Sequence, residues 1–437
     1  MELRDFIVTP VIIILIYWIA YLVRPHVTDD LNRVYFFPAL TLKLIGALAL
    51  GLVYQFYYDS GDTFMYHTYG SRLVWGAFME SPAAGLKLLW ANSESTTGIY
   101  QYASKIYLFG DSNSYMIIRI ASVFDLLTFS TYSATACLFA VLSFIGSWQF
   151  YITFYNQFPH LHARLAIAAF FIPSVFFWGS GVLKDTVTLA FLGIATYQFY
   201  VVFIKRKFRL VNILLLLVSL FFIFSIRKFL LQAYLPAVIL WIGMSHIGRI
   251  RSIILKVMLV PFVGGVIVIS GYYAVIKVGE GDDRYAVSKI AMTGKVTAYD
   301  IRYWSGRNAG SGYSLGELDG SLGTMIGLAP EAINVSLFRP YLWEVKNPLM
   351  LFSALESTLL LFIVVYVVAK ERLRIFAGVT QFNILFALSF SLIFAFAIGV
   401  STYNFGTLVR YKVPLLPFFL TALILLLDYS KSERKFS

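Results

Sequence analysis

Long apolar runs separated by short polar connections extend along the chain from Phe6 to Leu427. A membrane-spanning helix needs about 20 apolar residues, because the hydrocarbon core of a bilayer is about 30 Å thick. Eleven segments meet this need, of which the fourth, sixth and eleventh are short. The predicted spans are residues 6–23, 36–57, 126–148, 165–180, 186–204, 211–226, 229–247, 257–276, 349–369, 376–400 and 413–427. The pattern therefore predicts an all-α, polytopic membrane protein.

The composition agrees with a membrane location. Of the 437 residues, 59% are hydrophobic and only 13% are charged, whereas soluble proteins carry about 25% charged residues. An ordinary soluble enzyme is excluded, because the chain lacks the polar residues to cover a water-exposed surface. No polar block is large enough to fold separately, so residues 1–437 are predicted to form a single transmembrane domain.

The net charge of +12 orients the chain. We expect no nucleic-acid partner, because the Lys and Arg residues form short clusters between apolar segments instead of one basic patch. Short cytoplasmic loops retain positive charge, and 16 basic residues share one side if the N-terminus lies outside. The prediction is a multi-pass protein of the plasma (inner) membrane with an outer N-terminus and a cytoplasmic C-terminus. The 16 residues are Arg24, Arg33, Arg164, Lys205, Arg206, Lys207, Arg209, Arg249, Arg251, Lys256, Lys370, Arg372, Arg374, Lys431, Arg434 and Lys435.

Two connections, residues 58–125 and 277–348, are too long to be simple turns, and both fall on the predicted outer side. Loops this long are usually functional or disordered, and the first is rich in aromatic residues, which disordered segments avoid. Within it, residues 63–78 and 98–109 are predicted to form amphipathic helices at the membrane surface. The second loop is rich in Gly and Ser over residues 306–327, which indicates a lid.

Acidic residues open the first long loop. Asp59 and Asp62 lie three residues apart, close to an apolar boundary that would raise a carboxyl pKa. This arrangement suits a general base that deprotonates a hydroxyl group. The alternative is a turn in which Asp62 caps the helix that starts at Thr63.

Cationic residues occur at three further positions on the predicted outer side. Lys184 and Asp185 interrupt an apolar region and could hold a lipid phosphate and its partner, or Asp185 could cap the following helix while Lys184 extends to the interface. The pair Arg227 and Lys228 is disfavoured there by the positive-inside rule, and it would bind or anchor to an anionic headgroup. Arg410 opens the last span, where a guanidinium suits bidentate phosphate recognition.

The chain shows no sequence motif of a soluble nucleotide-binding protein or a metallohydrolase. It has no Gly-rich P-loop, no dinucleotide fingerprint after a strand and no His-Glu-x-x-His motif. Its five His residues do not cluster on the outer side, so a zinc site is not expected. No cofactor is predicted with certainty, and a divalent cation held by the acidic residues is an alternative to neutralisation by the basic ones.

The order of these features resembles the GT-C superfamily of integral-membrane glycosyltransferases, which take sugars from polyprenyl-phosphate carriers. Residues 100–110 and 114–120 are similar to its stretch after the acidic motif, and residues 173–185 to its segment that precedes an Asp. Residues 410–417 are similar to its closing Arg-Tyr-x-x-Pro-x-x-Pro motif. The chain departs from many members in one extra N-terminal helix and in acidic residues that are not adjacent.

The resemblance implies a glycosyltransferase that moves a sugar from a polyprenyl-phosphate carrier to a hydroxyl of a glycan or lipid acceptor at the outer face, in cell-surface glycan assembly. Its partners would be that carrier, the acceptor and membrane lipids. Asp59 or Asp62 would be the catalytic base. The implied phosphate-binding residues are Lys184, Arg227, Lys228 and Arg410, and the implied substrate-binding residues are Tyr66, His67, Asp185, Arg339, Glu344 and Tyr411.

Two alternatives stay open. The large outer loop with its Arg residues also resembles the O-antigen polymerases and ligases, relatives that join lipid-linked glycans. A transporter of lipid-linked glycans is a non-enzymatic alternative, for which ionisable residues near the bilayer midplane are typical. Lys43, Asp125 and Glu356 are the few such residues in or beside the predicted spans.

Overall fold

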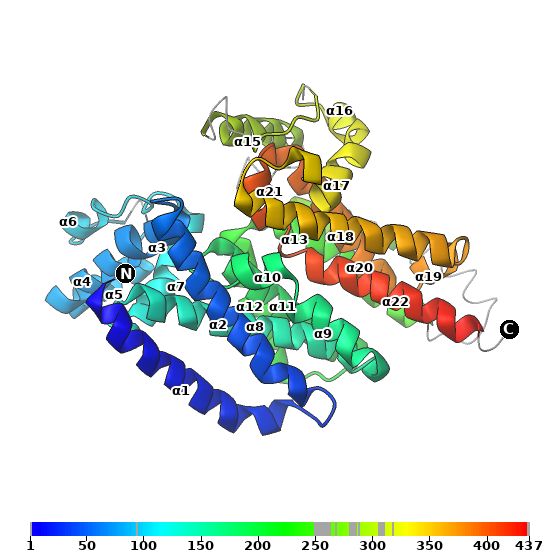
Figure 1. The fold of residues 1–437 in the computed structure, drawn as a ribbon. Helices are drawn as coiled ribbons and strands as arrows, with labels where there is room; N and C mark the ends of the chain where they lie inside the picture. The colour runs from blue at the N-terminus through cyan, green and yellow to red at the C-terminus, as the bar shows by residue number, and fades with distance from the viewer. Residues whose placement is uncertain are drawn as a thin grey trace. The chain divides into compact units, whose positions relative to one another are not determined.

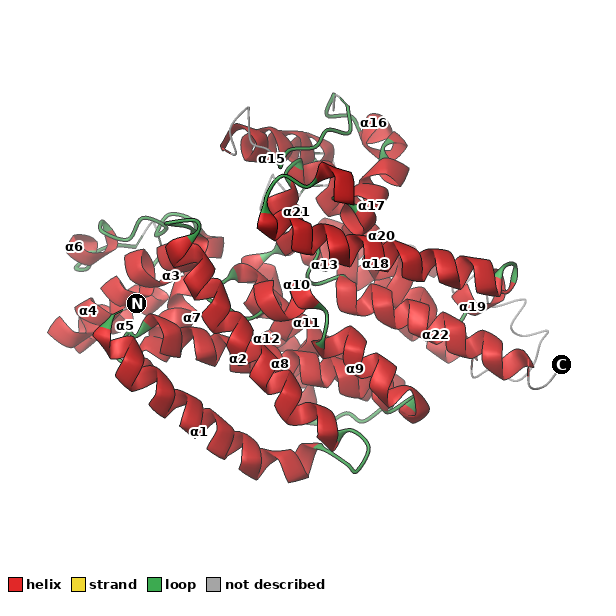
Figure 2. Cartoon of the chain, viewed as in Figure 1, coloured by secondary structure: helices red, strands yellow, loops and turns green. Residues whose placement is uncertain are grey.

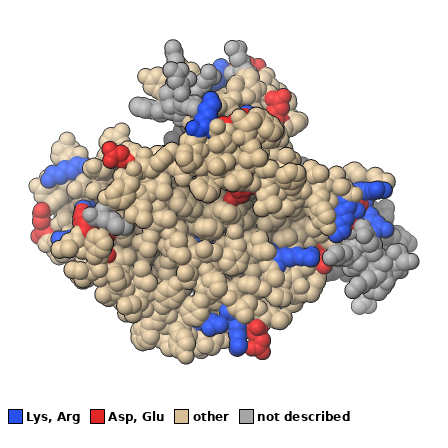
Figure 3. All heavy atoms as spheres, viewed as in Figure 1, with Lys and Arg blue, Asp and Glu red and all other residues tan. Residues whose placement is uncertain are grey.

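The computed structural model describes residues 2–92, 95–248, 264–266, 269–278, 286, 289–304, 311–316 and 319–434. Regular secondary structure in these residues is helical (Figures 1 and 2), apart from one isolated antiparallel bridge between Gly312 and Asn404. The predicted all-α class is therefore confirmed. Figure 3 shows a surface made largely of residues other than Lys, Arg, Asp and Glu, as an apolar environment requires.

Seven helices of the described residues are long and apolar enough to cross a membrane, by length and composition. An eighth span results if the bent pair Phe405–Tyr411 and Leu416–Tyr429, which are inclined by 64°, counts as one. The seven are Leu3–Val27 (α1), Arg33–Phe56 (α2), Tyr132–Tyr155 (α8), Lys184–Ile204 (α11 with η3), Lys228–Gly248 (α13), Pro348–Glu371 (α18) and Phe382–Thr402 (α20).

Three of the other predicted segments differ in detail. Residues 165–180 do not form one helix, because the chain breaks before Pro173 into His162–Phe170 (α9) and Pro173–Trp178 (α10); proline is favoured in the first helical turn and disfavoured within a helix. The sixth segment forms Leu210–Ile226 (α12), which is only 17 residues long. Most of residues 257–276 lies outside the described residues.

The contact pattern divides the chain into two compact units. Unit 1 comprises Met1–Gln198 and Leu214–Arg227, and unit 2 comprises Phe199–Ile213 and Lys228–Ser437. Besides the elements already given, unit 1 contains Asp62–Tyr66 (α3), His67–Ser71 (η1), Arg72–Glu80 (α4), Pro82–Trp90 (α5), Tyr100–Ala103 (α6), Ser112–Thr128 (α7) and Pro159–Leu161 (η2). Unit 2 contains Ile290–Trp304 (α15), Leu322–Gly327 (α16), Ala329–Phe338 (α17), Leu342–Glu344 (η5), Arg374–Val379 (α19), Phe405–Tyr411 (α21) and Leu416–Arg434 (α22).

Small residues bring the central helices of unit 1 close together. A Cβ atom added to Gly146 of α8 would lie 2.1 Å from the carbonyl oxygen of Ala190 in α11, and one added to Gly193 would lie 2.1 Å from that of Gly146. Helices in membranes associate through such close packing, because lipid supplies no hydrophobic driving force between them. Helix α1 is different, since large apolar side chains such as Phe6, Ile14 and Trp18 are exposed on it and available to lipid.

Replacing Gly146 by alanine is expected to destabilise unit 1 by about 1–3 kcal/mol, because the added methyl group must push α8 and α11 apart. Gly76 of α4 is the matched control, since nothing lies within 4 Å of its Cβ position. Gly76→Ala should stabilise its helix by about 0.5–1 kcal/mol. Thermal unfolding of both variants in detergent measures the contrast, and equal melting temperatures would contradict the close approach of the two helices.

Aromatic residues form the core of unit 2 around α20. Trp241 of α13 stacks on Phe386 of α20 with ring centroids 4.3 Å apart, and its Nε1–H donates to Asn383 Oδ1 at 2.9 Å. Two parts of the predicted lid are described, residues 311–316 and 319–327, and the second includes α16. The first part is hydrogen-bonded to the start of α21 and the residues before it: Tyr313 N donates to Tyr403 O, and Phe405 N donates to Ser311 O.

The first long loop contains helices, as predicted, but not all of them where predicted. Elements α3, η1 and α4 follow one another without a break over Asp62–Glu80, which agrees with the helix predicted for residues 63–78. The helix predicted for residues 98–109 is wrong, because only the four residues of α6 are helical there. Gly98 has a positive φ of 78°, and tight turns follow α6, such as Lys105 N to Tyr102 O.

Candidate functional site

Charged residues from four separate segments gather in unit 1, and we call them the Lys184 cluster. Lys184 and Asp185 begin α11, Arg227 directly follows α12, and Asp62 begins α3. The fifth member, Asp111, caps α7. Each lies at or next to a helix end, where charge is less costly than within an apolar helix.

The cluster contains two ion pairs of different exposure. Arg227 Nη2 lies 2.8 Å from Asp185 Oδ1, and these side chains are 5% and 0% exposed. Lys184 Nζ lies 3.4 Å from Asp111 Oδ2, with side chains 21% and 44% exposed. Lys184 also interacts electrostatically with Arg227 and with Asp62. The first pair is therefore closed to solvent, whereas the second is partly exposed.

Asp111 is a member that the sequence analysis missed. Its side chain accepts hydrogen bonds from Asn113 N at 3.2 Å and from Ser114 Oγ. Burial disfavours its charged form, but the Lys184 ammonium and these hydrogen bonds outweigh burial and hold the pKa of the Asp111 carboxyl below its usual value. The signal available in the sequence was the Asp that precedes Ser-Asn-Ser at the start of a helix, which is a capping pattern.

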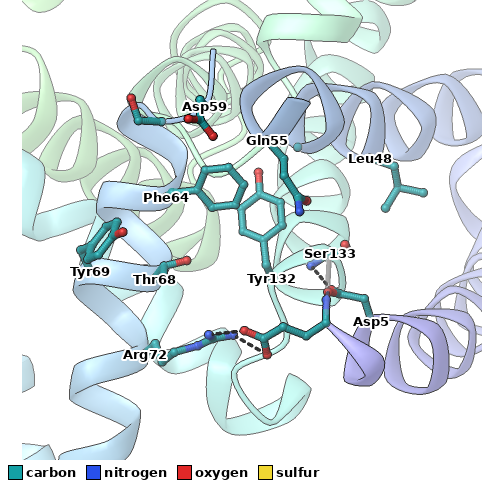
Figure 4. Close-up of a pocket in the computed structure, with 13 residues that line it drawn as sticks. Asp5, Leu48, Gln55, Asp59, Phe64, Thr68, Tyr69, Arg72, Tyr132 and Ser133 are labelled. Atoms are coloured by element: carbon teal, nitrogen blue, oxygen red, sulfur yellow. Dashed lines mark hydrogen bonds and ion pairs between the residues drawn. The ribbon is translucent and has the colours of Figure 1, made fainter. Parts of the chain in front are cut away.

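The two acidic residues of the first loop face different surroundings. Asp59 has a positive φ of 57° and Gly61 one of 136°, so the chain turns sharply between the carboxylates. Asp62 interacts with Lys184, whereas Asp59 lines a separate pocket of about 250 Å³ in unit 1 (Figure 4). A spacing of three residues therefore does not place Asp59 and Asp62 in one environment.

Tyr66 and His67 are buried, at 5% and 0% exposure, and neither lines the pocket. His67 Nε2 lies 3.4 Å from Asp125 Oδ1, and both side chains are fully buried. Asp125 also accepts a hydrogen bond from Thr135 Oγ1 at 2.7 Å. His67 of η1 therefore takes part in a buried polar contact with α7 and is not accessible to solvent.

Five predicted site residues lie in unit 2. Arg339 Nε donates to both oxygens of Glu344 at 3.1 and 3.0 Å, and its guanidinium lies over the rings of Tyr313 and Phe405. Lys228 begins α13, and Arg410 and Tyr411 end α21. The ring of Tyr411 lies 6.5 Å from that of Phe229, the residue after Lys228. All the contacts given for these five residues are contacts within unit 2.

Two buried lysines, Lys43 and Lys412, have hydrogen-bond partners inside the protein. Lys43 of α2 donates to Ser143 Oγ at 2.9 Å and to the carbonyl oxygens of Val175 and Gly179 at 3.1 and 3.0 Å. A cation suits the C-terminal end of α10, where helical carbonyls have no intrahelical donor. In unit 2, Lys412 donates to Ser357 Oγ at 2.8 Å. Lys43 thus stabilises the break between α10 and α11.

Comparison of the chain with protein-family models, curated proteins and solved structures gives no match. The resemblance to the GT-C superfamily therefore stays a prediction from the sequence. Among the described residues, no group of three or more His, Cys, Asp or Glu side chains is arranged to hold a metal ion. Unit 1 contains both the Lys184 cluster and the pocket lined by Asp59.

Proposed function

We propose that the chain transfers a sugar from a polyprenyl-phosphate carrier to a hydroxyl group at the outer face of the plasma (inner) membrane. The observation that carries this proposal is the Lys184 cluster, in which Lys184 lies beside the carboxylates of Asp62 and Asp111. The proposal includes an outer N-terminus, a cytoplasmic C-terminus and about eleven spans. An anionic lipid that enters between apolar helices would meet these charges at the helix ends.

The reaction we propose inverts the anomeric carbon. The acceptor oxygen attacks that carbon and forms the new glycosidic bond, while the bond to the phosphate oxygen breaks and its electron pair leaves with the polyprenyl phosphate. Asp62 takes the proton of the acceptor hydroxyl, as a positioned carboxylate can. Lys184 offsets the negative charge that grows on the leaving phosphate, a contribution that is large where water is excluded.

Lys184 and Arg227 have different parts in this proposal. Arg227 is bound to the fully buried Asp185, so its charge is already neutralised. The partner of Lys184, Asp111, is partly exposed, and an ammonium group is a compact charge that can exchange one anion for another. Lys184 would therefore bind the phosphate, while Arg227 and Asp185 act as positioning residues for the start of α11.

Transfer from radiolabelled polyprenyl-phosphate hexoses and pentoses, measured with the purified chain in liposomes, tests the proposal. The chain should transfer label from at least one donor, and Lys184→Met should lower the rate about 10²–10³-fold. Lys87→Met is the matched control. It removes the same charge from an exposed residue of α5 that lies outside the cluster. No transfer from any donor, or equal rates for the two variants, would show that the proposal is wrong.

A further inference from the structure

The pocket lined by Asp59 is distinct from the Lys184 cluster, since no member of that cluster lines it. Its volume of about 250 Å³ is below the range of about 300–1,000 Å³ that is usual for drug-sized ligands. The pocket could hold roughly eight water molecules at about 30 Å³ each. A ligand that fills it is therefore small, of the size of a single sugar ring.

The first turn of α1 forms one wall of this pocket and is fixed in place by charged groups (Figure 4). Arg72 of α4 donates to both carboxylate oxygens of Glu2, at 2.6 and 3.1 Å, and to the carbonyl oxygen of Ser130 at 3.2 Å. Asp5 accepts a hydrogen bond from Ser133 N at 3.1 Å. The hydrogen bond from Arg72 holds the pKa of the Glu2 carboxyl below its usual value, so the wall remains charged.

The charges that line the pocket select against an anion. The pocket is lined by three carboxylates and one guanidinium, those of Glu2, Asp5, Asp59 and Arg72. Because Arg72 is already bound to Glu2, a phosphate group in this pocket would be repelled by the remaining carboxylates. A ligand that carries no negative charge and has hydroxyl groups to donate to these carboxylates therefore fits the pocket.

The rest of the lining offers further contacts of the kind that a sugar ring uses. Gln55 and Thr68 supply groups that both donate and accept hydrogen bonds. Phe64 and Tyr132 present their rings to the pocket, with centroids 4.8 Å apart, and Tyr132 is held by a 2.8 Å hydrogen bond between its hydroxyl group and Thr63 Oγ1. Figure 4 shows Gln55, Phe64, Thr68 and Tyr132 directed towards the same space from α2, α3, η1 and α8.

We propose that this pocket binds one neutral sugar ring, and that this ring is the acceptor of the transfer reaction. The second part rests on the proposed function, whereas sugar binding does not. Asp59 accepts hydrogen bonds from the acceptor sugar and orients it, so that the attacking hydroxyl group extends from the pocket to Asp62, which takes its proton. Helix α1, the extra N-terminal helix of this chain, supplies the outer wall of the acceptor pocket.

Cysteine labelling tests this assignment without any transfer reaction. The single native cysteine, Cys137, is fully buried, so a maleimide reagent should report only on an introduced cysteine. Ser60→Cys places the label in the pocket, and Gly110→Cys places it at an exposed position with nothing within 4 Å of its Cβ site. The wild-type chain measures any background labelling of Cys137.

The probes are the methyl glycosides of glucose, galactose, mannose, N-acetylglucosamine and a pentose, with inorganic phosphate as the anionic comparison. At least one glycoside should slow the labelling of Ser60→Cys about tenfold at a concentration about ten times its Kd. It should leave Gly110→Cys unchanged, and adding Gln55→Leu should abolish the protection. The proposal is overturned if no glycoside protects Ser60→Cys, if phosphate protects it instead, or if Gln55→Leu has no effect. Protection without sugar transfer would refute the proposed function alone.

Discussion

Replacing Asp62 by asparagine is expected to lower the turnover of sugar transfer by about 10²–10⁴-fold, the usual contribution of a positioned general base. Asparagine has nearly the same shape and keeps its place at the start of α3, but its amide cannot take a proton. The KM for the acceptor should change little, because Asp62 does not line the acceptor pocket. Steady-state kinetics in liposomes with varied acceptor concentration measure both quantities.

Asp59→Asn is the matched variant, since it makes the same chemical change three residues away. It should raise the KM for the acceptor about tenfold or more, because hydrogen bonds to charged groups contribute about 1.5–3 kcal/mol, and it should leave turnover largely intact. The reverse result, with turnover lost in Asp59→Asn and kept in Asp62→Asn, would make Asp59 the base. Full activity in both variants would exclude either carboxylate from catalysis.

Replacing Arg227 by methionine is expected to destabilise unit 1 by about 3–5 kcal/mol, because it removes the cation beside a fully buried carboxylate. Asp185 Oδ1 lies 2.8 Å from Arg227 Nη2, and the two side chains are 0% and 5% exposed. A buried charge that loses its partner retains the desolvation cost without the compensating attraction. Thermal unfolding in detergent should show a clear drop in the melting temperature.

Two comparisons separate this effect from a general loss of charge. The double variant Asp185→Leu with Arg227→Met should recover much of the stability, because replacing a whole buried pair by apolar residues is often nearly neutral. Arg33→Met should cost no more than about 1 kcal/mol, since Arg33 and Asp30 form an exposed pair whose atoms are 3.4 Å apart. If the single and double variants of the buried pair melt alike, the pair does not stabilise the fold as described.

The sequence determined those properties that depend on neighbouring residues. Apolar runs near residues 36–57 and 376–400 predicted helices that the structure contains as α2 and α20. Pro173 marked the place where the predicted span over residues 165–180 is divided, although the prediction did not use it. The acidic and basic residues at helix ends were visible in the same way, because charge is tolerated there and costly inside an apolar helix.

Only the tertiary structure decided which of these charged residues lie in contact with one another. Asp111 and Lys184 are 73 positions apart in sequence, and no local pattern could pair them or show that Asp185 is bound to Arg227 instead. The chain turns at Asp59 and Gly61, with φ values of 57° and 136°. Because of this turn, the carboxylates of Asp59 and Asp62 lie in different surroundings although they are close in sequence. His67 belongs to the helix predicted for residues 63–78 and was an implied substrate-binding residue, yet it lies fully buried beside Asp125. The physical reason is that helix formation depends on residues a few positions apart, whereas burial and ion pairing depend on how distant helices pack.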